Sequence, residues 1–300
     1  MRLTDVIKNG PLMKMHGCGN DFAVLMDPHK AFDAGTADVR QLVGRICSRR
    51  FGVGSDGLIA IMPPRTEKTA YRMKFFNPDG SDAEMCGNGI RCLAKYLADN
   101  VEGIGVPSEI PVDTDAGDLM IEIQQNSRVE AMVRVNMRIP EQKNPTQINA
   151  KPDAGGVVRV SSSGVTDLIY VGMGNPHVVK FTADPEAMVG KYGPLIEKDT
   201  PIFPQKTNVE FVRVNAPDDL TMLVWERGAG ETLACGTGAC AAFVAAVLDG
   251  RSGKRATLRL RGGNLVIEWE GSGSPVFMTG SARNVFEIVP ESIDAFLGDG

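Results

Sequence analysis

Two cysteines stand in the same short pattern, once in each half of the 300-residue chain. The copies are Cys86-Gly87-Asn88-Gly89 and Cys235-Gly236-Thr237-Gly238, and each runs directly into an apolar stretch with helical spacing. A helix start lowers the pKa of a thiol, and glycines let backbone N–H groups approach an anion closely. Each copy therefore predicts a thiol acid or base beside a place for a carboxylate.

A matched pair of thiols suits the inversion of a stereocentre. One cysteine, as a thiolate, would take a proton from a substrate carbon, and the other, as a thiol, would return one from the opposite side. The repeat predicts that two similar domains each contribute one cysteine to a shared cleft. The alternative is that both are buried structural cysteines, but two copies in equivalent settings favour the catalytic interpretation of Cys86 and Cys235.

Turns of the chain are rich in amide and charged side chains. Taken singly, an asparagine in a turn usually serves turn geometry, and His177 or Glu226 could be an ordinary structural residue. Together they would supply hydrogen-bond donors, acceptors and one bidentate cation for a zwitterionic ligand, which matches an amino-acid substrate. The set comprises Asn20, Asn77, Asn88, Asn175, His177, Asn208, Glu226 and Arg227.

Composition narrows the class of protein. The formal net charge is −5, without a basic run of the kind that nucleic-acid binding needs. No stretch of about 18 apolar residues is present, and the N-terminus lacks the apolar core of a signal peptide. Six scattered cysteines make no disulfide framework in a chain of this size. We expect a cytoplasmic protein with free thiols that acts on a small molecule, without nucleic acid or membrane as partner.

Neither a nucleotide cofactor nor a metal is expected. Residues Gly52–Gly57 fit the pattern G-x-G-x-x-G, but they follow a helical stretch and open a strand, the reverse of a dinucleotide-binding fingerprint. On a helix, Cys92 points away from Cys86, and Cys240 away from Cys235, which argues against metal binding by these pairs.

Apolar spacing predicts the elements that hold these residues. Helices are expected over 38–50, from Cys86 to about residue 98, and over 235–248, among more numerous strands. The class is therefore α+β. Length and the repeat predict two domains, 1–135 plus 281–300 carrying Cys86, and 136–280 carrying Cys235.

At the level of whole motifs, the chain resembles the diaminopimelate epimerase family. The matching segments run in family order from about residue 13 to 280. They are Met15–Phe22, Phe76–Ser81, Glu84–Gly89, Met173–His177, Asn208–Val212 and Glu226–Gly238.

The resemblance implies two pseudo-symmetric domains, each a curved, barrel-like, mostly antiparallel sheet around a central helix. It implies cofactor-independent, two-base epimerisation of LL-2,6-diaminopimelate to the meso form, in lysine and peptidoglycan precursor biosynthesis, by a homodimer. Cys86 and Cys235 would be the bases, and which is the thiolate at rest stays open. The α-carboxylate would lie at Gly87, Asn88, Gly236 and Thr237, and the distal amino-acid end at Asn20, Asn77, Asn175, Asn208 and Arg227. Glu226 and His177 would tune the thiols or bind the α-ammonium.

The chain departs from the family pattern at a few positions. Gly57 stands where some members carry a glutamine that contacts substrate, and Trp225 stands where tyrosine is common. Cys18 adds a thiol close to Asn20, and residues 1–11 have no counterpart.

Other functions remain open. Proline, hydroxyproline and histidine racemases share the implied architecture; proline-type enzymes have histidine where this chain has Asn88, whereas a histidine racemase is harder to exclude. A thiol hydrolase using one cysteine with His177 would make the other cysteine dispensable. A non-catalytic binding protein would need neither.

Overall fold

The computed structural model describes residues 3, 6, 10–141, 147–153 and 156–289. The chain divides into two compact units. The first unit comprises the residues up to Val135 together with those from Gly280 onward, and the second comprises Asn136–Thr279. Most of residues 1–11, and 290–300 at the end of the chain, lie outside the described residues.

In the first unit eight strands pair in a closed ring. The order is β1-β2-β3-β4-β6-β7-β8-β17, and β17 pairs back onto β1. The pairs are antiparallel except β2–β3 and β4–β6 among those whose register is resolved. The strands are β1 (Leu12–Gly17), β2 (Asn20–Met26), β3 (Leu58–Met62), β4 (Tyr71–Phe76), β6 (Ser108–Asp113), β7 (Leu119–Asn126), β8 (Glu130–Asn136) and β17 (Val276–Ile288), with short β5 (Asp82–Ala83) beside β4.

The second unit repeats this plan. Its strands run β10-β11-β12-β13-β15-β16-β17, with parallel pairs at β11–β12 and β13–β15 as in the first unit. The segment after β8 bonds to Val276 and, at Glu141, to Gly172 of β10, which completes the ring. The strands are β9 (Arg159–Ser162), β10 (Val165–Gly172), β11 (Pro176–Phe181), β12 (Asn208–Ala216), β13 (Asp219–Glu226), β14 (Gly230–Thr232), β15 (Arg255–Leu260) and β16 (Gly263–Trp269).

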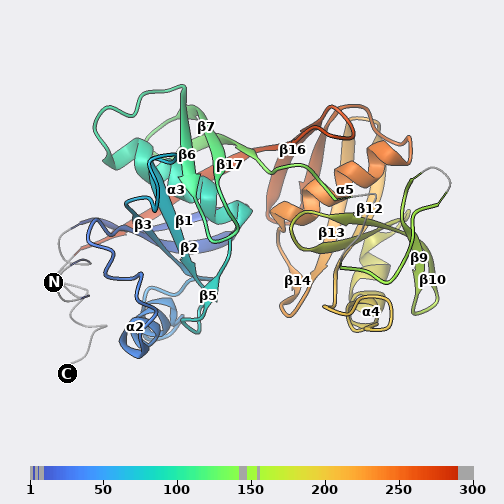
Figure 1. The fold of residues 1–300 in the computed structure, drawn as a ribbon, viewed down its shortest axis with the longest axis horizontal. Coiled ribbons are helices and arrows are strands. Elements are labelled where there is room, and N and C mark those ends of the chain that lie inside the picture. The colour runs from blue at the N-terminus through green and yellow to red at the C-terminus, as the bar shows by residue number, and fades with distance from the viewer. Residues whose placement is uncertain (1–2, 4–5, 7–9, 142–146, 154–155, 290–300) are drawn as a thin grey trace. The chain divides into compact units, whose positions relative to one another are not determined.

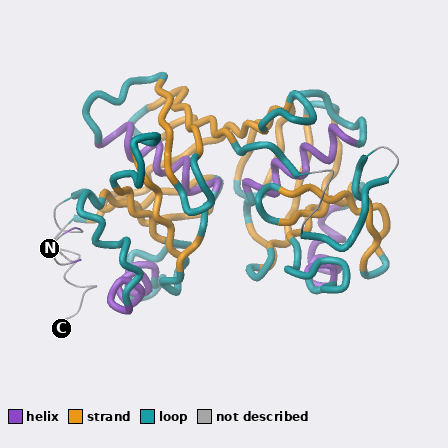
Figure 2. Tube along the Cα trace, viewed as in Figure 1, coloured by secondary structure: helices purple, strands orange, loops and turns teal. Residues whose placement is uncertain are grey.

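One helix lies among the strands of each unit (Figure 1; Figure 2). These helices are α3 (Gly87–Asn100) and α5 (Gly236–Leu248). A helix enclosed by a barrel must be buried on every side, and α5 accordingly carries almost only small and apolar residues. In α3, Arg91 and Lys95 are also buried, and each is held by several hydrogen bonds.

A second helix packs on the outside of each sheet. Helix α2 (Ala37–Cys47) begins at Thr36, whose side chain accepts from Val39 N, and buries its apolar side against β2 and β3. Helix α4 (Pro185–Glu197) begins at Asp184 in the same way and packs on β12 and β13.

The expected α+β class, with two similar sheets around central helices, is confirmed. Helices at 38–50, from Cys86 and from Cys235 are present with shifts of a few residues at their ends, since each cysteine is the residue before the helix. Helix α4 was not expected from the sequence: Gly190, Gly193 and Pro194 break its pattern. No helix within the described part of the chain has the length and apolarity to cross a membrane.

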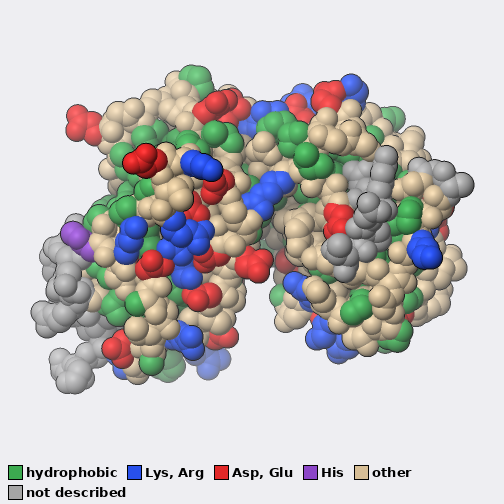
Figure 3. Space-filling model, viewed as in Figure 1, with side chains coloured by type: hydrophobic (Ala, Val, Ile, Leu, Met, Phe, Trp, Pro, Cys, Tyr) green, Lys and Arg blue, Asp and Glu red, His purple; other side chains and the backbone are tan. Residues whose placement is uncertain are grey.

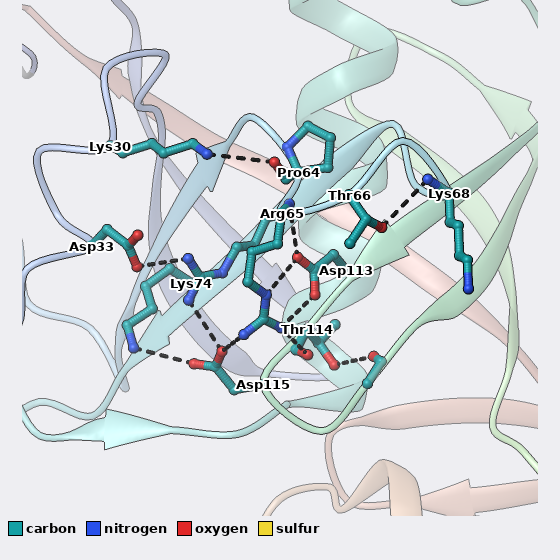
Figure 4. A network of polar contacts seen from close by, with 12 residues as sticks. Lys30, Asp33, Pro64, Arg65, Thr66, Lys68, Lys74, Asp113, Thr114 and Asp115 are labelled. Carbon is teal, nitrogen blue, oxygen red and sulfur yellow. Dashed lines mark hydrogen bonds and ion pairs between the residues drawn. The ribbon is translucent and has the colours of Figure 1, made fainter.

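Ion pairs connect the strand ends of the first unit (Figure 4). Arg65 binds Asp113 through two nitrogens, at 2.5 and 2.8 Å, and donates to Asp115 at 3.1 Å. Arg72 and Lys74 also donate to Asp115, both at 3.2 Å. Basic and acidic side chains accordingly lie interspersed on this face of the unit (Figure 3).

Candidate active site

The first predicted base stands directly before the first buried helix. Cys86 is the N-cap of α3, where its half-buried side chain lies 3.5 Å from the Oδ1 of Asn20. The same oxygen accepts a hydrogen bond from the Nδ2 of Asn88, at 3.3 Å. In this arrangement a Cys86 thiol donates to Asn20, because an amide oxygen only accepts.

The amide of Asn20 is oriented by a carboxylate. Its Nδ2 donates to Asp56 at 2.8 Å, and because a carboxylate only accepts, the amide oxygen must face Cys86. Arg49 bridges Asp56 (2.6 Å) and Asp21 (2.8 Å). Burial raises the pKa of Asp21, but hydrogen bonds from Arg49 and Lys14 outweigh it and hold that pKa well below its usual range. The network is therefore charged and fixed at neutral pH.

Arg91 supports the start of α3 from inside the barrel. It donates to the carbonyl of Gly87 and to the Oδ1 of Asn88, both at 2.9 Å. Its guanidinium also lies 3.6 Å from the sulfur of Cys18, which is buried. Asn88 is thus held on both ends of its amide, by Arg91 and by Asn20.

The second predicted base is more deeply enclosed. Cys235 precedes α5, and its sulfur accepts from the backbone N of Gly238 at 3.3 Å and lies 3.4 Å from the Oγ1 of Thr237. Burial, and then the negative charge of Glu226, raise the pKa of Cys235 well above its ordinary value. Cys235 is therefore a thiol at neutral pH in the structure described.

Three of the predicted binding residues meet beside β12 and β13. Asn208 donates to the carbonyl of Pro176 and accepts from the backbone N of Arg227, each at 2.9 Å. The Arg227 guanidinium donates to the carbonyl of Gln205 at 3.1 Å. Glu226 accepts from the hydroxyl of Thr232 at 2.5 Å.

His177 lies between two oxygen atoms. Its Nδ1 is 2.7 Å from the Oε1 of Glu210, and its Nε2 is 2.9 Å from the Oδ1 of Asn175. His177 and Glu210 are both fully buried, whereas Asn175 is half-buried. The imidazole of His177 therefore contacts the side chain of Asn175 and is not exposed to solvent.

The predicted site residues form one group in each unit. The first unit holds Asn20, Cys86, Gly87 and Asn88 together, whereas the side chain of Asn77 bonds to Ser81 within its own turn, at 3.0 Å. The second unit holds Asn175, His177, Asn208, Glu226, Arg227, Cys235, Gly236 and Thr237. Cys92 and Cys240 are fully buried, in agreement with their assignment to the core.

Several residues that support the groups were not selected from the sequence, among them Arg49, Arg91, Glu210 and Asp56. Glu210 lies in an apolar strand, where an unpaired charge would be costly, and that exception was the available signal. Asp56 sits in a glycine-rich turn that resembles an ordinary loop. Next to it, a β-carbon at Gly57 would lie 2.5 Å from both the ring of Phe75 and the carbonyl of Phe76. Glycine at position 57 thus permits close packing of the backbone.

Among the described residues, no group of three or more His, Cys, Asp or Glu side chains is arranged to hold a metal ion. The chemistry available from these groups is acid–base chemistry at sulfur, with backbone and amide donors around it.

Comparison with known proteins identifies the family. The family model described as diaminopimelate epimerase matches residues 12–139 and 169–285. The chain belongs to the diaminopimelate epimerase family. It is 46% identical over 280 residues to a diaminopimelate epimerase of Desulfitobacterium hafniense, covering 92% of this chain and 96% of the relative. It is 44% identical over 284 residues to one of Pelotomaculum thermopropionicum, with 91% and 96% covered. Like other diaminopimelate epimerase family members, it is an isomerase.

Solved structures of low sequence identity share the fold of this diaminopimelate epimerase family member. A predicted epimerase from Pseudomonas aeruginosa superposes with a TM-score of 0.65 at 15% identity, covering 93% of this chain and 98% of that one. A probable proline racemase from Agrobacterium radiobacter K84 gives 0.62 at 15% identity, with 93% and 91% covered. At this identity the likeness concerns the fold alone.

Proposed function

We propose that the protein converts LL-2,6-diaminopimelate to meso-diaminopimelate without a cofactor, using Cys86 and Cys235 as the two acid–base groups. The observation that carries the proposal is the equivalent setting of the two cysteines: each is the residue before a barrel-enclosed helix. Relatives at more than 40% identity over nearly their whole length bear the name of this activity.

In the proposed mechanism the two sulfurs have opposite protonation states. Cys235 enters as the thiol, because burial and the nearby carboxylate of Glu226 disfavour its thiolate. Cys86 then acts as the base toward the LL isomer: it first releases to solvent the proton that it donates to Asn20 in the structure described. Its thiolate then takes the α-proton, and Cys235 returns its own proton to the other face of the carbon. The reverse reaction exchanges these roles.

The difficult step is removal of a weakly acidic α-proton by a thiolate. Removal of the proton leaves a carbanion, whose negative charge spreads onto the neighbouring carboxylate. The backbone N–H groups of Gly87–Asn88 and Gly236–Thr237, at the starts of α3 and α5, would stabilise this charge by donating hydrogen bonds to the carboxylate. Asn20, Asn77, Asn175, Asn208 and Arg227 would hold the distal amino-acid end.

The test is proton NMR in D2O with reductant, following LL-diaminopimelate, proline and histidine for α-deuterium uptake and loss of optical purity. We expect uptake and inversion with LL-diaminopimelate alone, and a loss of at least 10³-fold in Cys86→Ala and Cys235→Ala. Cys240→Ala, which alters a buried thiol on the same helix as the Cys235 cap, is the matched control and should stay active.

Other outcomes separate the competing functions. Exchange with histidine or proline only would assign a sister racemase. No exchange with any of the three amino acids would reopen the hydrolase and the binding protein. A thiol hydrolase would keep its hydrolytic activity after loss of one cysteine, and a non-catalytic protein would keep its binding after loss of both.

We further propose that the enzyme acts as a cytoplasmic homodimer in lysine and peptidoglycan precursor biosynthesis. Light scattering on the purified protein decides the oligomeric state, since one chain has a mass of 32.2 kDa.

A further inference from the structure

The two cysteine sites differ at one position beneath the helix start. In the first unit a β-carbon at Gly89 would lie 3.0 Å from the side chain of Ile59 on β3. In the second unit a β-carbon at Gly238 would lie 2.6 Å from the Oε1 of Glu210 on β12. The two strands occupy the same place in the repeat, since each pairs in parallel with the strand before it and antiparallel with the strand after it. A carboxyl group thus replaces an aliphatic side chain at one of two equivalent sites.

The carboxyl group of Glu210 determines how His177 is protonated. The Oδ1 of Asn175 cannot donate, so the Nε2 of His177, 2.9 Å away, must carry a hydrogen. The 2.7 Å contact between Nδ1 and Oε1 then requires one more proton, held by either atom. In both forms Nε2–H points at Asn175.

The remaining oxygen of Glu210 indicates where the shared proton lies. Oε2 is buried, and no group of the described residues forms a hydrogen bond with it. A carboxylate with one bare oxygen is poorly stabilised there, and burial accordingly raises the pKa of Glu210, although His177 opposes the rise. The pair is best satisfied as a neutral unit with Glu210 donating to Nδ1.

We propose that Glu210 is a positioning residue that acts through His177 on the side-chain amide of Asn175. With its oxygen held by Nε2–H, half-buried Asn175 can turn only its N–H₂ group outward. Asn175 therefore presents hydrogen-bond donors, which select a carboxylate over an ammonium group at that point of the ligand. This inference rests on the proposed amino-acid epimerase function.

The test compares Glu210→Gln with Glu210→Ile. Glutamine can donate to Nδ1 as the protonated carboxyl does, so the Nε2–H form and the Asn175 orientation are retained. Isoleucine, the residue at the equivalent position of the first unit, removes that donor. We expect KM for LL-diaminopimelate to stay within about 3-fold in the Gln variant and to rise at least 10-fold in the Ile variant, with a smaller change in kcat.

A second readout does not depend on activity. The chain has three histidines, so ¹⁵N NMR of the imidazoles, assigned with His16→Asn and His29→Asn, reports the protonated nitrogen of His177. We expect the Nε2–H form in the wild type and Glu210→Gln, and a mixture of forms in Glu210→Ile. An Ile variant that is folded by circular dichroism and has wild-type KM and an unchanged His177 spectrum would overturn the proposal.

The two proposals fail separately. If the wild type exchanges α-protons with no amino acid, the proposed function fails, while the NMR readout still reports the action of Glu210 on His177. If the wild type is active and both readouts are unchanged in Glu210→Ile, only the role of Glu210 fails.

Discussion

Cys235 is a thiol because its surroundings disfavour charge. Its sulfur is buried, and the negative charge of Glu226, at the end of β13, acts on it. A single backbone N–H and the hydroxyl of Thr237 oppose them. Any ligand that brings a positive charge to this site would ease ionisation, which ties the state of the sulfur to occupancy of the site.

Removing the charge of Glu226 should lower the pKa of Cys235. We expect Glu226→Gln to shift the midpoint of Cys235 alkylation by iodoacetamide to lower pH, measured on the Cys235 peptide by mass spectrometry in a Cys86→Ser background. Glu231→Gln is the matched control, because Glu231 lies in β14, the strand that pairs with the end of β13, and forms an ion pair with Arg261 at 2.7 Å. An equal shift in both variants, or a rise in Glu226→Gln, would contradict this account.

Gly238 should be intolerant of any side chain. A β-carbon there would meet the carboxyl of Glu210 at 2.6 Å and the β-carbon of Cys235 at 3.2 Å, so we expect Gly238→Ala to lower the free energy of unfolding by about 1–3 kcal/mol. Gly190→Ala, in α4, meets nothing within 4 Å and should be neutral or stabilising. Urea unfolding of both variants measures the difference, and equal midpoints would exclude the steric explanation.

Among individual residues, the sequence predicted the side chains that stand in a repeated or motif-like pattern. It did not predict the side chains that hold them in place. The cysteines were found because their pattern occurs twice. Glu210 and Asp56 were missed because their importance depends on which side chain lies across a strand pair or turn, and Asn20 and Asp56 meet across 36 positions of sequence. Local spacing carries no information about such contacts.

A charged side chain can be buried in a helix where neighbouring elements supply enough hydrogen-bond partners for it. Lys95 on α3 is fully buried, yet its Nζ donates to Asp99, to Asn126 and to the carbonyl of Ser127, at 2.7, 2.9 and 2.5 Å. The end of β7 and the turn after it thus hold the middle of the helix. Such bonds fix the rotation of α3 and hence the direction of its first residues.

The end of β6 should contribute to stability in a pH-dependent way. Burial raises the pKa of Asp113, but hydrogen bonds and charge from Arg65 outweigh it, so the folded-state pKa lies below the unfolded one. The stabilisation is therefore complete above the unfolded-state pKa and is lost as pH falls through the folded-state pKa. We expect Asp113→Asn to cost about 1–2 kcal/mol at pH 7, reduced by the partial exposure of Arg65, and less in acid.

Denaturant unfolding at pH 7 and pH 3 checks this expectation. Glu270→Gln is the control, because Glu270 and its partner Lys254 are both largely exposed, and such pairs contribute little. A loss in Asp113→Asn that is the same at both pH values would show that the carboxylate charge does not matter.

Helices and strands with a regular spacing of apolar residues were predicted from the sequence. Those whose spacing is interrupted by glycine or proline were not. Helix α2 has its apolar residues on one side and was expected within a few residues. Helix α4 was missed, although Asp184 followed by Pro185 is a typical helix start. Strand β11 was missed because its first residues were assigned to the Asn175–His177 turn.

On the scale of the whole molecule, the chain contains the same arrangement twice. In each unit one parallel pair is joined through the outer helix, and the next parallel pair is joined through the buried helix. The Cys-Gly-x-Gly pattern therefore occurs twice in the sequence because the whole unit that contains it occurs twice. Strand β17 belongs to both, since its first four residues fall in the second unit and the rest in the first.

The units should unfold separately. Both tryptophans, Trp225 and Trp269, lie in the second unit, so tryptophan fluorescence reports that unit alone, whereas circular dichroism reports both. Ala282 and Met278 are fully buried in β17, one in each unit. We expect Ala282→Asp to cost roughly 3 kcal/mol or more and to shift a dichroism transition while fluorescence is unchanged, with Met278→Asp shifting fluorescence. Coincident shifts of both signals in both variants would mean that the chain unfolds as one unit.

The two-fold plan was implied by the repeated cysteine pattern and the resemblance. The barrel-like form of each sheet was implied by the resemblance alone. Local spacing could not predict it, because closure depends on pairings such as β1 with β17, which lie far apart in the sequence.

The strand β17 also bears on how the protein is made. Residues of β1 to β8 are synthesised first, but their ring has a gap that only the second part of β17 fills, beside β1 and β8. The second unit is continuous in sequence and is complete once Thr279 has been added. On the ribosome, the unit encoded first is therefore the last to close, and the edges of β1 and β8 stay unpaired until β17 has been synthesised.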